Sequence, residues 1–225
     1  MANRVSTNSS FTRVYGDLTR TFNRMARTQG QIASTKKLEK PSDNPTDVAV
    51  ALKERSTQRR LEQYANNAID AVGWLRVSDS ALMGVQDEAM NARVQLASAV
   101  SGATDAQSRE AIANAIEGIR DNIVQLGNTS FGGRYVFAGT ASTATPPFGP
   151  AGAYAGDGGA VRRVIDDGVT VDVNITGAAV FGARNAGTPL AGDMFQALDE
   201  MAKAVRADDA TAMKAAGAPL TARSP

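Results

Sequence analysis

The sequence predicts a mainly α protein: an elongated, antiparallel, coiled-coil-like helical hairpin or bundle that carries a small inserted β subdomain. Apolar residues recur every seven positions for more than five heptads after Leu61, which is coiled-coil spacing. A second helical pattern follows a Gly-containing break, so the two helices should fold back on each other. Beyond it, Gly-rich segments and alternating Val and polar residues indicate short strands.

These patterns divide the 225-residue chain into four parts. The expected parts are a labile N-terminal helix with a joint (1–44), a long helical hairpin (45–130), a small β domain (131–183), and a return helix with a truncated tail (184–225).

The composition excludes several classes of function. The chain has no cysteine and no histidine, so it has no disulfide or thiolate site and lacks the commonest general base and metal ligand. The formal net charge of +1 gives no overall attraction to nucleic acid or to a membrane. Aromatic residues make up 5% of the chain, so we expect an aliphatic core.

The N-terminal segment predicts an amphipathic helix. The first 40 residues carry eight basic and two acidic side chains. A basic arm for nucleic acid is one interpretation, but the polar face of a helix explains the charges better, because apolar residues interleave at helical spacing. The row that begins with Val14 continues with three threonines, so this helix should be marginal alone and become ordered against a partner. The predicted assembly interface consists of Phe11, Val14, Leu18, Phe22, Met25 and Ile32.

The stretch "PSDNP" predicts a joint between two helices. A proline disfavours the helical conformation in the residue before it, so two prolines interrupt helix through residues 40–44. Asn44 is a good N-cap, Pro45 suits the first helical position, and Asp47 complements the positive end of the helix dipole. The predicted joint consists of Pro41, Ser42, Asp43, Asn44 and Pro45.

The helical hairpin should be held together by an apolar seam along its two helices. Alanines at many seam positions indicate that the backbones approach closely. The second helix should run from about residue 105 to residue 128. The predicted seam consists of Leu61, Leu75, Leu82, Val85, Leu96, Ile112, Ile116, Ile119, Ile123 and Leu126.

From Phe131 onward the pattern changes to that of a small β domain. We expect two strands joined by a turn at Asp167-Gly168. Val169, Val171, Val173 and Ile175 should lie on one face of the second strand. Helix returns over residues 193–206, and the following "KAAGAPLTARSP" shows no strong structural pattern.

No motif of this chain predicts catalysis. "GDGG" at residues 156–159 could bind phosphate or calcium, but it lacks the Lys and Ser/Thr of a phosphate-binding loop, and a tight turn explains it. Adjacent Asp166 and Asp167 belong to a turn rather than to a converging acid pair. We therefore expect that the chain is not an enzyme and that it binds no cofactor and no metal ion. The sequence also has no apolar run of about 20 residues, which a membrane span needs, and no secretory signal.

Three stretches together resemble the flagellar hook-associated protein 3 family. "ASTKKLEKPSDNPTDVAVALKERSTQRRLEQYANNAIDAVGWLRVSDSAL" is similar to the N-terminal segment that flagellins share with their junction relatives. "QLGNTSFGGRYVFAGT" resembles the entry to that family's outer domain, and "YAGDGGAVRRVIDDGVTVDVNITGAAVFG" resembles its small β domain. The resemblance covers residues 1–206.

This resemblance implies a flagellin-like fold and a structural adaptor at the junction between flagellar hook and filament. The implied partners are the hook-side junction protein, flagellin, further copies of the chain in a ring, the flagellar export machinery and an export chaperone. The implied location is the extracellular flagellum, reached through the flagellar channel without signal cleavage. Two alternatives remain open: a short filament flagellin, and a cytosolic coiled-coil module whose basic arm binds nucleic acid.

The chain departs from the family in two places. Thr35 stands where the family usually has glycine, so the local bend should differ. The chain also stops near the point where the family's long C-terminal helix should begin. Without that helix, apolar surface of the hairpin should stay exposed, so we expect the chain to self-associate or to be less stable than a form that has it.

Overall fold

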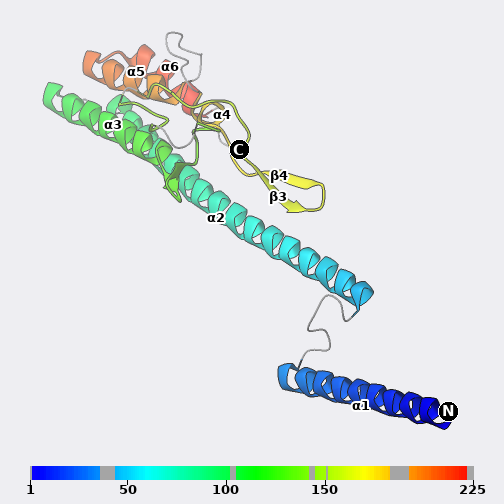
Figure 1. Cartoon of the computed structure of the whole chain (residues 1–225). Helices are drawn as coiled ribbons and strands as arrows, with labels where there is room; N and C mark the ends of the chain where they lie inside the picture. The colour runs from blue at the N-terminus through cyan, green and yellow to red at the C-terminus, as the bar shows by residue number, and fades with distance from the viewer. Residues whose placement is uncertain are drawn as a thin grey trace. The chain divides into compact units, whose positions relative to one another are not determined.

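The computed structural model describes residues 2–35, 44–101, 105–141, 145–150, 152–182 and 193–221. It confirms the predicted fold class: most described residues are helical, and the strands form two small two-stranded sheets (Figure 1). The chain divides into two compact units, residues 1–62 and 63–225, with the boundary inside a long helix.

The first unit consists of α1 (Ala2–Ser34) and the beginning of α2 (Pro45–Ser101). Helix α2 begins at Pro45, as the sequence predicts. The side-chain Oδ1 of Asn44 accepts hydrogen bonds from the backbone N–H of Thr46 at 3.2 Å and of Asp47 at 3.4 Å. Asn44 therefore caps the helix and provides an acceptor for two N–H groups that lack partners within it.

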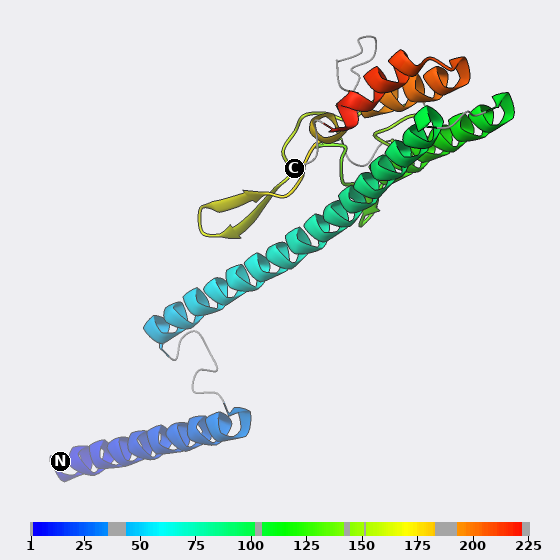
Figure 2. The ribbon, with the colours of Figure 1, turned by 180° about the vertical axis from the view of Figure 1, so that it is seen from behind.

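The second unit contains a helical hairpin. Helix α3 (Ala106–Gly127) lies antiparallel beside the C-terminal part of α2 (Figures 1 and 2). Asp105 caps α3 by accepting a hydrogen bond from the N–H of Ser108 at 2.7 Å. Asn122 of α3 donates to Glu88 of α2 at 2.9 Å, which fixes the register of the two helices at that point.

The structure places the predicted seam residues in three environments. Val85, Leu96, Ile116, Ile119 and Ile123 are buried. Leu82, Ile112 and Leu126 are partly buried and pack against the same core.

The remaining two seam residues correct the sequence analysis, because Leu61 is 58% exposed and Leu75 is 44% exposed. A strict seven-residue row drifts by about 20° per heptad around a straight α-helix. The row that is buried at Leu96 has therefore turned away from the core by the time it reaches Leu61. The buried row of α2 consists of Ala71, Trp74, Ser78, Ala81, Val85, Ala92, Leu96 and Ala99.

Two C-terminal helices complete the packing of this unit. Helix α5 (Met194–Ala207) packs against α3 and against α6 (Ala210–Thr221) (Figure 2). Helix α6 corrects the expectation of an unstructured tail. Asp209 accepts hydrogen bonds from the N–H of Thr211 and of Ala212, each at 3.0 Å, and the alanine-rich sequence that follows favours helix.

The insert between α3 and α5 contains the strands. β1 (Ser130–Phe131) pairs with β2 (Arg134–Tyr135), and β3 (Arg162–Asp166) pairs with β4 (Val169–Asp172), both antiparallel. The turn between β3 and β4 lies at Asp167-Gly168 as predicted, and Gly168 has the positive φ of 72° that favours glycine there. The predicted apolar row does not form one buried face. Val173 is buried, whereas Val169, Val171 and Ile175 are exposed, because the hairpin contacts α2 through Arg163 and Val164 of β3 and not through β4.

The core between α2 and α3 is mainly aliphatic, as the sequence predicts, whereas the insert meets the helices through aromatic rings. Neighbouring ring centroids in this group lie between 4.8 and 5.7 Å apart. Five of the twelve aromatic residues of the chain meet here. The aromatic cluster consists of Phe137, Phe148, Tyr154, Phe181 of α4 (Gly177–Phe181) and Phe195.

Candidate assembly surfaces

Helix α1 presents an exposed apolar stripe. The six predicted interface residues all lie on this helix, and each is between 54% and 73% exposed. At 100° per residue they fall within an arc of roughly 100°, which is the width of a stripe that packs against another helix. Tyr15 belongs to the same arc and is 75% exposed. Tyr15 is not part of the predicted interface, although it lies four residues after Phe11 on the same face of the helix.

Two threonines beside this stripe are better suited to burial than their polarity suggests. The hydroxyl of Thr21 donates to the carbonyl of Asp17 at 2.9 Å, and that of Thr28 donates to the carbonyl of Arg24 at 3.0 Å. Because these hydroxyls have partners within α1, a second helix could cover them without leaving an unpaired polar group. The threonine row therefore weakens the predicted interface less than expected.

Helix α1 ends at an unusual backbone position. Thr35 has a φ of 54°, in the left-handed region that glycine favours after a helix. The position keeps the glycine-like conformation although it holds a β-branched residue. We expect Thr35→Gly to stabilise the last turn of α1 by about 1 kcal/mol, because a left-handed conformation costs an L-residue roughly that much. Slower amide hydrogen exchange at residues 31–35 would confirm it, and unchanged or faster exchange would contradict it.

The predicted joint is partly described. Asn44 and Pro45 form the start of α2, while Pro41, Ser42 and Asp43 lie outside the described residues.

Two polar contacts attach the β3–β4 hairpin to α2. Asn67 donates from Nδ2 to the carbonyl of Val164 at 2.8 Å. Arg163 donates from Nε to Oδ2 of Asp70, also at 2.8 Å, and the guanidinium is largely shielded from solvent. The contacts fix one side of the hairpin to the helix. Sequence reasoning gave no signal for them, because the partners are more than 90 residues apart.

Asp157 of the "GDGG" stretch holds a loop of the insert closed. Its carboxylate accepts hydrogen bonds from the hydroxyl and the N–H of Thr140 and from the N–H of Gly159. These donors, the Thr140 hydroxyl first, hold the pKa of Asp157 below its usual value. The structure thus assigns the motif to a loop contact.

The lowered pKa of Asp157 predicts loss of loop stability in acid. A carboxyl group with a lowered pKa in the folded state contributes stability above its unfolded pKa, about 3.9, and loses it as the pH falls through the folded pKa. We expect the protection of the Thr140 and Gly159 amides, measured against the intrinsic exchange rate at each pH, to fall as the pH is lowered from about 5 to below 3. Asp157→Asn should show that lower protection already at pH 5 and a smaller change with pH. Equal pH dependence in both proteins would contradict this assignment.

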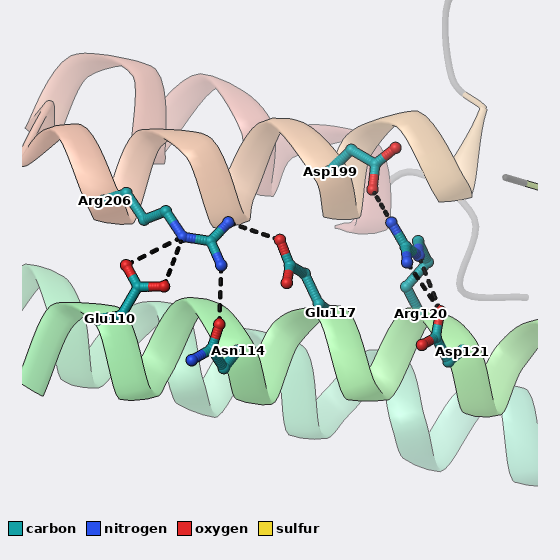
Figure 3. A network of polar contacts seen from close by, with 7 residues as sticks. All are labelled: Glu110, Asn114, Glu117, Arg120, Asp121, Asp199 and Arg206. Atoms are coloured by element: carbon teal, nitrogen blue, oxygen red, sulfur yellow. Dashed lines mark hydrogen bonds and ion pairs between the residues drawn. The ribbon is translucent and has the colours of Figure 1, made fainter.

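A polar network joins α3 to α5 (Figure 3). Arg206 of α5 donates from Nε to both oxygens of Glu110 at 3.1 Å, from Nη1 to Glu117 at 2.5 Å and from Nη2 to Asn114 at 2.8 Å. The bond from Arg206 lowers the pKa of Glu117. Further along α3, the guanidinium of Arg120 forms an ion pair with Asp199 of α5 at 2.7 Å and a second one with its own neighbour Asp121 at 2.8 Å. The network fixes the register of α5 on α3.

We expect Arg206→Met to lower the melting temperature at low ionic strength. The difference in melting temperature between the variant and the wild type should shrink in about 1 M salt. At that concentration the Debye length is roughly 3 Å, so salt screens the ion pairs of the wild-type network and weakens them. Thermal melts followed by circular dichroism measure both. Lys203→Met, which removes an exposed charge from the same helix, is the control and should change the melting temperature little. A salt-independent loss would indicate that Arg206 acts through packing of its stem.

Among the described residues, no group of acidic side chains is arranged to hold a metal ion. Nor does the described part of the chain contain a helix long and apolar enough to cross a membrane.

The chain matches the model of a known protein family over most of its helical part. The match is to the bacterial flagellin N-terminal helical region and covers residues 5–142. The chain belongs to this flagellin family. This range includes nearly all of α1 and the whole of α2, α3 and the first sheet, so the surfaces described above lie largely within the family's shared region.

Two relatives are more specific than the family model. The chain is 27% identical to flagellar hook-associated protein 3 of Salmonella typhimurium over 181 residues, which is 80% of this chain and 57% of that protein. It is 29% identical to the protein of the same name from Escherichia coli over 153 residues, 67% of this chain and 48% of that one. The chain therefore spans about half the length of these relatives.

Solved structures show the same fold. FlgL from Bacillus cereus matches with a TM-score of 0.63 at 23% identity, covering 78% of this chain and 82% of that one. FlgL from Xanthomonas campestris matches with a TM-score of 0.51 at 24% identity, covering 56% and 42%. The predicted resemblance to hook-associated protein 3 is confirmed by the two sequence relatives.

Proposed function

We propose that this chain is a structural subunit of the bacterial flagellum that assembles at the junction between hook and filament. The observation that carries the proposal is the match to hook-associated protein 3 from two species, which extends over 80% and 67% of this chain. The family model describes flagellin itself, so it is the sequence relatives that favour the junction over the filament.

The α1 stripe is the proposed assembly surface. Its apolar side chains are exposed in the single chain, and burying them against neighbouring helices would be favourable at about 25 cal/mol per Å² of apolar area. The proposed partners are a hook-side junction protein below, flagellin above, and further copies of this chain in a ring.

The second unit would act as the rigid body of the subunit. The network of Arg206 and Arg120 locks α5 to α3, and Arg163 with Asn67 attaches the β3–β4 hairpin to α2.

The proposed location is the extracellular flagellum, reached unfolded through the flagellar channel without signal cleavage and with the help of an export chaperone. The composition is compatible with this route, because a chain without cysteine has no disulfide to break before export or to form again after it.

Immunogold electron microscopy tests the proposal, with an antibody raised against residues 131–182 and cells lacking the gene as the control. A narrow band at the point where hook meets filament is the expected result. Label along the whole filament would identify a short filament flagellin instead. Label confined to the cell interior would favour the cytosolic coiled-coil module.

A further inference from the structure

Helix α2 carries a second regular stripe on the side that faces away from its buried row. Ile69, Val72, Met83 and Met90 are 71%, 46%, 55% and 50% exposed. The spacing along the stripe alternates between four and three residues, which is the spacing of a coiled-coil seam. We call it the α2 outer stripe; it consists of Ala65, Ile69, Val72, Arg76, Asp79, Met83, Gln86 and Met90.

Two opposite charges lie at the centre of this stripe. Arg76 and Asp79 are exposed, and no hydrogen bond or ion pair joins either side chain to another described residue. A hollow of about 380 Å³ lies between this part of α2 and the insert, lined by both charged side chains and by Val173 and Ile175 of the insert. Because neither charge has a partner among the described residues, both are available to a second chain.

The α2 outer stripe is symmetric about its midpoint, which lies between Val77 and Ser78. If a second copy of the helix is laid against the first in the reverse direction about this midpoint, each residue of the stripe lies opposite another residue of the stripe. Apolar positions then meet apolar positions at Val72 with Met83, and the charges meet as Arg76 with Asp79. The two outer pairs are Ala65 with Met90 and Ile69 with Gln86.

We propose that a second copy of this chain docks on the α2 outer stripe as an antiparallel helix pair, with the two-fold axis passing between the two helices at the level of Val77 and Ser78. The contact is isologous: Arg76 of each copy faces Asp79 of the other, so the axis creates two identical ion pairs. The paired positions extend on both sides over about 38 Å, the length of 25 helical residues, and Val72 with Met83 and Ala65 with Met90 are the apolar pairs.

The charges of Arg76 and Asp79 determine which partner fits the α2 outer stripe and whether it lies parallel or antiparallel to α2. A parallel pair in register would place Arg76 against Arg76 and Asp79 against Asp79, and like charges across an interface oppose binding. A purely apolar helix would cover both charges without giving them a partner. A reversed copy of α2 satisfies both charges at once.

This pairing differs from the packing expected in a flagellar ring, where neighbouring subunits point the same way. It would therefore belong to the free protein and dissociate on assembly. That consequence rests on the proposed function, whereas the pairing itself does not.

Sedimentation velocity over a concentration series tests the pairing. The full chain is expected to form a dimer. Arg76→Asp and Asp79→Arg should each raise the dimer dissociation constant roughly tenfold, because each places like charges at both central contacts. The double variant Arg76→Asp with Asp79→Arg should restore it. Lys203→Asp makes the same charge change outside the stripe and should have no effect. A chain that stays monomeric, or a dimer unaffected by the single variants, would overturn the proposal.

Cysteine cross-linking tests the direction, and the absence of native cysteine makes the result unambiguous. A mixture of Val72→Cys and Met83→Cys chains should form a disulfide between copies. Val72→Cys alone should not, because the two positions would lie about 16 Å apart along the axis, beyond disulfide reach. Efficient cross-linking of Val72→Cys alone would indicate a parallel pair. A dimer abolished by Leu18→Glu, with Val72→Lys neutral, would place the contact on α1. Either result would contradict the proposal.

Discussion

Replacement of Phe148 by alanine is expected to lower the free energy of unfolding of the unit formed by residues 63–225 by about 3–5 kcal/mol. Phe148 is 2% exposed, and its ring centroid lies 5.2 Å from that of Tyr154, 4.8 Å from that of Phe181 and 5.3 Å from that of Phe195. The ring is therefore at the centre of the aromatic cluster.

The surroundings of Phe148 cannot collapse easily into the space that its ring would leave. The backbone of Phe148 is fixed, because its N–H donates to Asn128 at 2.9 Å and its carbonyl accepts from Asn128 at 2.8 Å. The ring also packs directly on Gly127 at the end of α3 and on Gly177 at the start of α4. A cavity at this point would loosen the junction between the insert and the helices.

Urea unfolding followed by circular dichroism measures the loss. Phe148→Leu should cost less than Phe148→Ala, because it fills part of the space. Phe22→Ala, which truncates an exposed ring on α1, should change the stability by no more than about 0.5 kcal/mol. If Phe148→Ala were as mild as Phe22→Ala, the cluster would not be part of the stabilising core.

The double variant Leu18→Glu with Phe22→Glu is expected to abolish assembly and to reduce swarming to the level of cells lacking the gene. Both side chains lie at the centre of the α1 stripe. Carboxylates buried there without partners would oppose packing of α1 against another helix. The fold of residues 63–225 should be unaffected, because neither residue belongs to that unit.

Complementation of a deletion strain measures the effect, with the amount of protein released into the medium as a check on export. Asn23→Glu adds an acid on α1 outside the apolar arc, and it should leave swarming near the wild-type level. Normal swarming by the double variant would rule out the α1 stripe as the assembly surface. Equal loss in the Asn23→Glu control would indicate a general intolerance of α1 to negative charge.

Local signals in the sequence predicted the helices and turns well. Asn44 and Pro45 begin α2 because capping and the φ of proline depend only on neighbouring residues. Asp167-Gly168 makes its turn for the same kind of reason. Helix α6 was missed although Asp209 is a good N-cap, because the short segment after it has no clear apolar periodicity.

Which side chains are buried is harder to predict from the sequence than which residues form helices. Leu61, Leu75 and Leu96 belong to one seven-residue apolar row in the sequence, but of these three only Leu96 is buried in the structure. The apolar pattern along one helix does not predict which other elements of the fold pack against it, or along how much of its length they do so. The aromatic cluster could not be predicted at all, since its five rings come from four separate segments of the chain.

The sequence by itself determined that this protein is a helical hairpin with a β insert, where its helices begin, and that it resembles the flagellar hook-associated proteins. Those properties depend on the order of neighbouring residues. Only the tertiary structure decided which face of α2 is buried, that Arg163 meets Asp70 and Arg206 meets Glu110 and Glu117, and that two apolar stripes stay exposed. These contacts join residues that are far apart in the chain, and their formation depends on the distances that packing sets.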